Sequence, residues 1–230
     1  MIDSEIIAIH NELRKDLIMA INVVEDPEGY PEQLKLQDLV GNEMAKRAIE
    51  VALVGNHSVV FIEMIDSQAD KLLEATENLA DTLGVDFTGS IVSLCKCKAY
   101  GSPNHKCTCS MASIKKHLES IAKTIKGADI IVETTAPMDY ETTNRNELEE
   151  DVIKRIDSVN NFKTNPIAKD SEQFLDYAIE IGHINDKDKV IRIANTICNM
   201  EKANEIQVNH IAEAIQNQHS SINSAIADYV

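Results

Sequence analysis

Residues 36–62, LQDLVGNEMAKRAIEVALVGNHSVVFI, contain the helix and strand patterns that decide the fold of this chain. Asn42 can cap a helix that runs to about Val54, and Gly55 can end it. The helix is apolar on most sides, so we expect it to be largely buried; its apolar positions are Met44, Ala45, Ala48, Ile49, Val51, Ala52 and Leu53. The segment that follows, SVVFIEM at residues 58–64, is a short β-branched run and predicts a buried strand.

Helices and strands continue to alternate after this segment. The patterns predict a helix over 67–83 that Gly84 stops, a strand over 89–94, a helix over 111–126 and a strand over 128–134. Only helices follow, over 144–160, 171–181 (with Ser171 as cap and Gly182 as stop), 187–199 and 207–218. We therefore predict an α/β fold with a short, mainly parallel sheet and a C-terminal helical domain. The predicted domains are 1–40 (a helix over 5–23 and a linker), 41–140 (the core) and 141–230 (the helices).

Composition narrows the class of protein. The chain has 230 residues, of which 43% are hydrophobic but only 4% aromatic, so the core must be aliphatic. No apolar run approaches the length of a membrane-spanning helix, and the charged N-terminus lacks a secretory signal. We therefore expect a cytoplasmic protein with no membrane partner, whose thiols are reduced and available to a metal ion.

The cysteine loop, residues 95–109 (CKCKAYGSPNHKCTC), holds four of the five cysteines as two Cys-x-Cys pairs. Zinc in structural sites takes four such ligands in a tetrahedron, about 2.3 Å from the metal. Gly101, Ser102 and Pro103 allow the loop to fold back, so we predict a structural zinc site at Cys95, Cys97, Cys107 and Cys109. A closed set of four thiolates leaves no position for a reactive water. The alternatives are that His105 replaces one cysteine, or that the thiols are free.

Charge is distributed unevenly along the chain. The formal net charge is −16, which argues against non-specific binding of nucleic acid by the whole surface. Residues 93–126, however, carry seven lysines against Glu119 alone, a local charge of +6. We expect a basic surface there that contacts nucleic acid or a protein partner, and an ordinary solvated helix face is the alternative. The candidate contact residues are Lys96, Lys98, Lys106, Lys115 and Lys116.

Three stretches, in the same order along the chain, resemble the magnesium-chelatase-like AAA+ family of the competence protein ComM type. The cysteine loop with the following SMASIKKH resembles that family's Cys-Pro-Cys-Gly-Tyr…Cys-x-Cys-Ser-Pro segment. Residues 36–62 resemble its entry to the ATPase core, including a Gly-x-His before the first strand. Residues 190–216, VIRIANTICNMEKANEIQVNHIAEAIQ, resemble its lid. The resemblance implies a reduced AAA+-like core with a zinc loop and a helical lid.

The residues that would bind ATP are replaced. Where the family has a P-loop, this chain reads EMIDSQADKL at residues 63–72, without glycine. By alignment, Glu63 replaces the first glycine, Ala69 the lysine and Asp70 the threonine. Glu63, Asp66 and Asp70 would place carboxylates beside a triphosphate, and two like charges 4 Å apart repel by about 4 kcal/mol at an effective dielectric of 20. We therefore expect this degenerate nucleotide site to bind no ATP.

Other catalytic parts of the family are missing too. No hydrophobic run ends in Asp-Glu, the arginine-finger segment reads Gly127, Ala128 and Asp129, and the lid arginines are replaced by Asn185 and Asn195, with Arg192 alone matching. We assign no catalytic residue. The leading hypothesis is a pseudo-ATPase that acts through a protein partner or as a homo-oligomer. DNA is a further candidate, because the ComM type is associated with DNA branch migration. The alternatives are a metal-dependent enzyme unrelated to ATP, or a structural component of a phage or mobile-element assembly.

Overall fold

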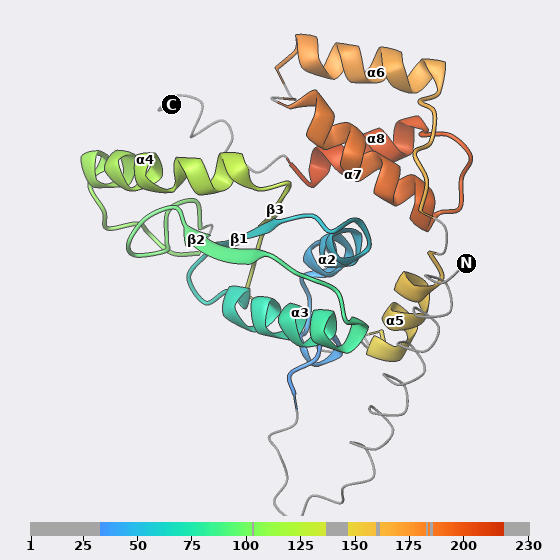
Figure 1. Cartoon of the computed structure of the whole chain (residues 1–230). Helices are drawn as coiled ribbons and strands as arrows, with labels where there is room; N and C mark the ends of the chain where they lie inside the picture. The colour runs from blue at the N-terminus through green and yellow to red at the C-terminus, as the bar shows by residue number, and fades with distance from the viewer. Residues whose placement is uncertain are drawn as a thin grey trace, which may run out of the picture. The chain divides into compact units, whose positions relative to one another are not determined.

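A three-stranded parallel sheet organises the fold of the computed structural model, which describes residues 33–102, 104–136, 147–159, 162–182, 184 and 186–218 (Figure 1). The strand order is β2-β1-β3, with Val59 of β1 opposite Gly89 of β2 and Ile130 of β3. The described residues from Leu34 onward belong to one compact unit. The elements are η1 (Leu36–Asp38), α2 (Glu43–Gly55), β1 (Val59–Glu63), α3 (Ala69–Leu83), β2 (Gly89–Ser93), α4 (Met111–Gly127), β3 (Ile130–Glu133), α5 (Glu149–Asp157), α6 (Lys169–Glu180), α7 (Lys187–Met200) and α8 (Val208–Gln216).

The predicted α/β class and short parallel sheet are confirmed, and the predicted strands and helices appear in the described residues within a few residues of their expected bounds. The helix expected over 5–23 lies outside the described residues. The assignment of this core and its helices to the AAA+ architecture stays a prediction. No helix in the described part of the chain has the length and apolarity that a bilayer span requires.

Strand β1 divides the apolar core into two layers, because alternate side chains of a strand point to opposite faces of a sheet. Val59 and Phe61 pack into the larger cluster, which contains the buried sides of α2 and α3 and extends to α7 and α8. Val60 and Ile62 pack into the smaller cluster, under α4. Figure 1 shows α4 on one side of the sheet and α3 on the other. The aliphatic core expected from the composition is therefore present in both layers.

Of three residues that the sequence assigns to helix ends, one has the predicted role and two do not. Gly84 stops α3 in the left-handed conformation, with φ of 65°. Asn42 lies at the start of α2 as expected, but its side chain binds the backbone of Thr135 instead of capping the helix. The prediction that Ser171 caps its helix is wrong, because α6 already begins at Lys169 and Ser171 is buried in its first turn.

The helix over 43–55 is largely buried, as predicted, with one exception. Met44 is 66% exposed, because it lies in the first turn on the side of α2 away from the core. Conversely Glu50, which the sequence does not single out, is buried on this helix. Its carboxylate is paired with arginine, which makes burial of the charge tolerable.

The C-terminal helices join the sheet through paired polar groups, which we call the joint. His57 Nε2 lies 2.8 Å from the hydroxyl of Thr196 on α7, and both residues are buried. The Thr196 hydroxyl donates to the carbonyl of Arg192, so it accepts from a protonated Nε2 of a neutral His57. Arg192 in turn pairs with Asp129, just before β3, at 2.6 Å. The joint thus ties α7 to the N-terminal ends of β1 and β3.

Candidate metal centre

The cysteine loop connects the end of β2 to the start of α4. The first Cys-x-Cys pair lies in a turn that closes when the amide of Lys98 donates to the carbonyl of Cys95 at 3.0 Å. Lys98 and Gly101 have φ of 61° and 84°, the left-handed conformation that reverses the chain direction. The second pair immediately precedes Ser110, whose hydroxyl caps α4 by accepting from the amide of Ser113. A strand and a helix therefore fix the two ends of the loop.

The four sulfur atoms of the loop converge. Their Sγ atoms all lie within 4.8 Å of one another, and the three closest pairs are 3.4, 3.5 and 3.7 Å apart. A tetrahedron with bonds of 2.3 Å to a central metal requires sulfur separations of about 3.8 Å. The predicted ligands Cys95, Cys97, Cys107 and Cys109 can therefore hold one metal ion with little movement. In the part of the chain that the structure describes, no other group of His, Cys, Asp or Glu side chains has this arrangement.

Backbone amides surround the sulfurs. The amide of Tyr100 lies 3.3 Å from the sulfur of Cys95. The amides of Ala99 and Thr108, with the Cys95 thiol, lower the pKa of Cys97 to about 5. A loop that points N–H donors at its thiols favours thiolates, which are the form that binds a metal.

Without a cation, the four thiols cannot all lose their protons. The Cys109 amide lowers the pKa of Cys107, but burial and the neighbouring sulfurs of Cys97 and Cys95 outweigh it and raise the pKa to about 12. The amide of Cys97 lowers the pKa of Cys109. The Cys97 thiol, burial and the neighbouring Cys95 sulfur outweigh that amide, so the pKa of Cys109 is raised as well. A dication would supply the missing charge, so metal binding and proton release are coupled at this centre.

His105 does not join the four sulfurs. Its Nε2 instead lies 3.5 Å from a carboxylate oxygen of Asp66, in the loop that follows β1. Lys98 makes a second link to the same region, because its ammonium pairs with Glu63 at 2.6 Å and its carbonyl accepts from the amide of Ile65 at 2.9 Å. The cysteine loop is therefore packed onto residues 63–66.

The degenerate nucleotide residues are brought partly together. Glu63 and Asp66 face the cysteine loop, through Lys98 and His105. Ala69 is fully buried at the start of α3, whereas Asp70, its neighbour, is exposed. Two of the three carboxylates expected near the phosphate position thus have partners from the cysteine loop.

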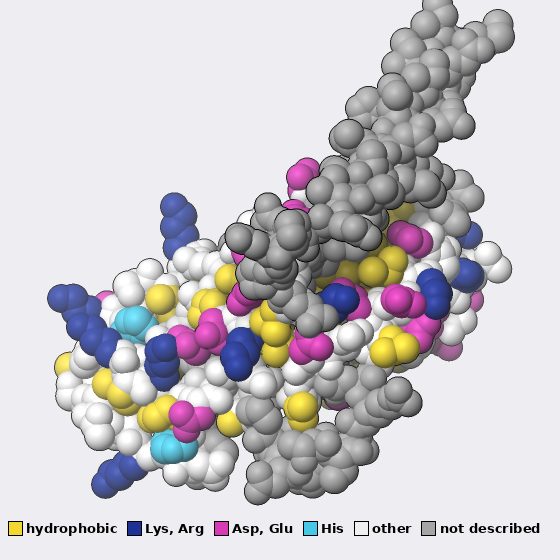
Figure 2. All heavy atoms as spheres, turned by 90° about the horizontal axis from the view of Figure 1, so that it is seen from below, with side chains coloured by type: hydrophobic (Ala, Val, Ile, Leu, Met, Phe, Trp, Pro, Cys, Tyr) yellow, Lys and Arg dark blue, Asp and Glu magenta, His cyan; other side chains and the backbone are white. Residues whose placement is uncertain are grey.

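The five lysines of the candidate basic surface are exposed. Lys96, Lys98 and Lys106 protrude from the cysteine loop, and Lys115 and Lys116 from the first turns of α4. Figure 2 shows lysine side chains standing out at the left of the molecule, the end at which Figure 1 places the cysteine loop and α4. The charge of Lys98 is paired with the carboxylate of Glu63.

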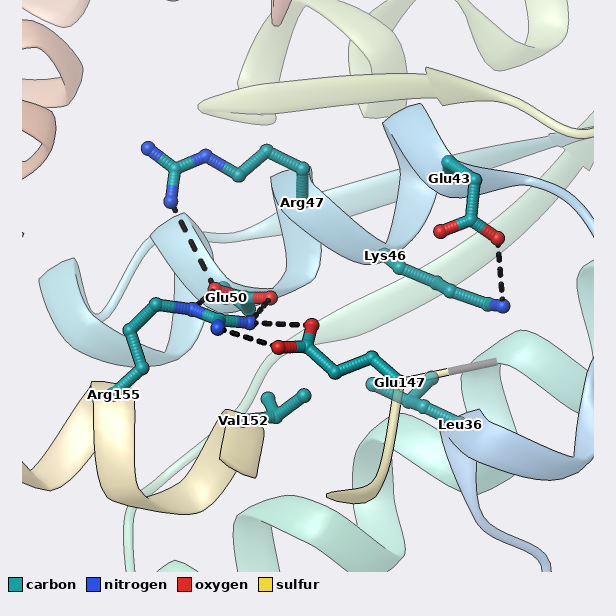
Figure 3. Close-up of a pocket in the computed structure, with 8 residues that line it drawn as sticks. All are labelled: Leu36, Glu43, Lys46, Arg47, Glu50, Glu147, Val152 and Arg155. Atoms are coloured by element: carbon teal, nitrogen blue, oxygen red, sulfur yellow. Dashed lines mark hydrogen bonds and ion pairs between the residues drawn. The ribbon is translucent and has the colours of Figure 1, made fainter. Parts of the chain in front are cut away.

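A cavity of about 250 Å³ lies away from this centre, between α2 and α5 (Figure 3). Arg155 of α5 spans it, with both Glu50 and Glu147 at 2.7 Å. Lys46 is also satisfied, since it donates to the carbonyl of Leu39 at 2.6 Å. Charges that neutralise one another offer little to a ligand, so we regard this network as structural. Sequence reasoning missed it, because Arg155 and Glu50, which link the two helices, are 105 residues apart and share no motif.

No known family model and no curated protein matches the chain. The resemblance to the magnesium-chelatase-like AAA+ family therefore rests on the three sequence stretches alone.

Proposed function

We propose that this protein is a non-catalytic binding or scaffold module, derived from an AAA+ ATPase, whose cysteine loop is held by a structural zinc ion. The observation that carries the proposal is the convergence of the four sulfurs of Cys95, Cys97, Cys107 and Cys109. Zinc suits this set best, because soft thiolates in a tetrahedron select zinc or iron–sulfur clusters. The three closest sulfur pairs are 3.4 to 3.7 Å apart and all four sulfurs lie within 4.8 Å of one another, which suits a single ion.

The donor set also supports a structural role over a catalytic one. Catalytic zinc keeps an open position for water, whereas four protein thiolates fill the tetrahedron. His105, the alternative ligand, faces Asp66. A metal-dependent enzyme is therefore the less favoured alternative, and the amide donors at Cys95 and Cys97 would serve to stabilise the thiolates.

Two glycine positions of the AAA+ resemblance have a physical reason in this fold. The glycine of the family's Cys-Pro-Cys-Gly-Tyr falls on Lys98, whose φ of 61° lies in the region that favours glycine. The glycine of Gly-x-His falls on Gly55, where an added Cβ would collide with the ring of His57 and the hydroxyl of Thr196. Both observations support descent from that family.

The loop after β1 supports the loss of ATP binding. A P-loop cradles phosphates with free backbone amides. Here the amide of Met64 binds the hydroxyl of Ser67, that of Ser67 binds the carbonyl of Met64, and that of Ile65 binds the carbonyl of Lys98. Since these amides are engaged and Glu63 and Asp66 add negative charge, the loop is suited to receive the cysteine loop and not a nucleotide.

The exposed lysines favour DNA as a second candidate partner, beside a protein partner or a second copy. Lys96, Lys106 and Lys116 are exposed at one end of the molecule. If each neutralised one phosphate, the logarithm of the affinity would fall with the logarithm of the salt concentration with a slope of about −2.7. A DNA affinity that does not change with salt, or that survives reversal of these lysines to glutamate, would exclude this partner.

Metal analysis and calorimetry on the same sample test the proposal. We expect about one zinc ion per chain and no heat on titration with Mg²⁺-ATP. A Cys198→Ser variant is the matched control, because Cys198 is buried among apolar side chains away from the loop and should leave the zinc content unchanged. Tight ATP binding would overturn the pseudo-ATPase assignment, and metal-free protein with an ordered loop would overturn the zinc assignment.

A further inference from the structure

The two edges of the sheet are unequally covered. On β3, the outward amide of Ile131 donates to the carbonyl of Asn217 at 2.7 Å, and Gln218 donates to the carbonyl of Asp129. On β2, the register shows which groups face outward. The amide of Val59 donates to the carbonyl of Thr88, so alternate residues from Gly89 turn their backbone groups away from β1.

These outward residues of β2 are Gly89, Ile91 and Ser93. In the described part of the chain, their outward groups receive one hydrogen bond, from the ring of His117 to the carbonyl of Ser93. Exposed edge strands are usually protected by charge, proline or a bulge. Strand β2 reads GSIVS in continuous register with β1 and has none of these.

We propose that β2 pairs with β2 of a second copy of this chain, antiparallel about a two-fold axis centred on Ile91. The outward groups of Ile91 would meet those of the partner's Ile91, and Gly89 would meet the partner's Ser93. This register makes about six backbone hydrogen bonds and joins the two sheets into one of six strands. The proposal depends neither on the metal nor on the AAA+ resemblance.

Charge complementarity supports this occupant. Asp86 is exposed three residues before β2, and Lys96 is exposed in the turn that follows it, so the two ends of the strand carry opposite charges. An antiparallel pairing brings the Asp86 end of one copy next to the Lys96 end of the other. The two-fold axis creates this opposite-charge pair twice. A parallel pairing would set like charges side by side.

The side of α4 above the β2 edge is compatible with a second copy. Because His117 reaches Ser93, the positions that share its side of the helix are Ser113, Ser120 and Thr124. None of these is charged, so two copies of α4 would meet through small polar side chains, with Lys116 and Lys123 at the margin of that contact. Because this contact consists mainly of backbone hydrogen bonds and small polar side chains, we expect a reversible dimer with a Kd on the order of 10 μM.

Ile91→Pro tests the pairing in the full chain. The amide of Ile91 faces away from β1, so proline removes the contact with the second copy and leaves the ladder to β1 intact. By sedimentation velocity up to about 200 μM, the natural chain should dimerise and the variant should remain monomeric, with unchanged far-ultraviolet circular dichroism. The proposal is overturned if the natural chain is monomeric, even if its β2 edge binds extended peptides. It is also overturned if the variant dimerises as well as the natural chain does.

A charge swap gives a second test that does not depend on tolerance of proline. Asp86→Lys and Lys96→Asp should each weaken the dimer about tenfold, and the double variant should restore the affinity. Lys96 lies between two ligand cysteines, so the metal content of each variant must match that of the natural chain. Weakening that the double variant does not rescue would contradict the antiparallel register.

Discussion

The cysteine loop and the joint at the C-terminal helices are held together by different physics. Apart from Cys95 and Ala99, the side chains of the loop are half-buried or exposed where the structure describes them, and its order depends on sulfurs, amides and the ion they can bind. The joint consists of paired polar groups, such as His57 with Thr196, set against the buried apolar side chains of α7. We expect the cysteine loop to lose its order when its metal ion is removed. The joint should keep its structure, because side-chain packing and hydrogen bonds stabilise it.

Cys95→Ser should have the largest effect. Cys95 is the fully buried ligand, and losing one of four thiolates should reduce the zinc content from about one ion per chain to near zero. We expect a loss of about 3 kcal/mol of stability, with amide exchange rising across residues 95–109. Exchange in α2 and α7 should change little. Equal loss of protection in α7 would show that the two regions are one cooperative unit.

Arg155→Ala tests the paired charges between α2 and α5. Glu50 is 6% exposed, and removing its arginine leaves a buried carboxylate with a weaker partner, Arg47, at 3.8 Å. The free energy of unfolding should fall by about 3 kcal/mol in urea denaturation, with zinc content unchanged. Lys154→Ala on the same helix is the control, since its pair with Asp151 is exposed and should contribute little to stability.

Gly55→Ala should strain the joint without touching the metal. The new Cβ would collide with His57 and Thr196, so we expect a loss of about 2 kcal/mol in thermal or urea unfolding. Gly127→Ala is the matched control, because a Cβ there meets nothing within 4 Å. A Gly55 variant as stable as the control would show that the joint has room to adapt.

The joint should also contribute a small pH dependence. Burial, partly offset by Asp129 and reinforced by Arg192, lowers the pKa of His57 below 6.5. The unfolded chain then binds the proton more readily, so this contribution is present above about pH 6.5 and is lost as the pH falls below it. Between pH 8 and pH 5, a His57→Gln variant should lose less stability than the natural chain. Identical pH profiles would contradict the neutral, buried state of His57.

Local sequence patterns predicted the helices and strands well, but they could not predict contacts between residues far apart in the sequence. The spacing of apolar residues and the glycine at position 84 predicted α3 and its end, and the spacing of the cysteines predicted the ligand set. Both patterns are local, because the residues that form them are close together in the sequence. Ser171 was misassigned because a serine at a helix start looks like a cap whether it is solvated or buried. The pairing of Arg155 with Glu50 could not be predicted, because it depends on how α5 packs against α2.

X-ray absorption at the zinc edge, on protein purified without added metal, tests the central claim most directly. We predict one zinc ion per chain with four sulfur ligands at about 2.3 Å and no nitrogen or oxygen in the first shell. A chain without metal would contradict the account. So would a spectrum that requires a histidine or a water ligand, which would instead favour an open, reactive metal site.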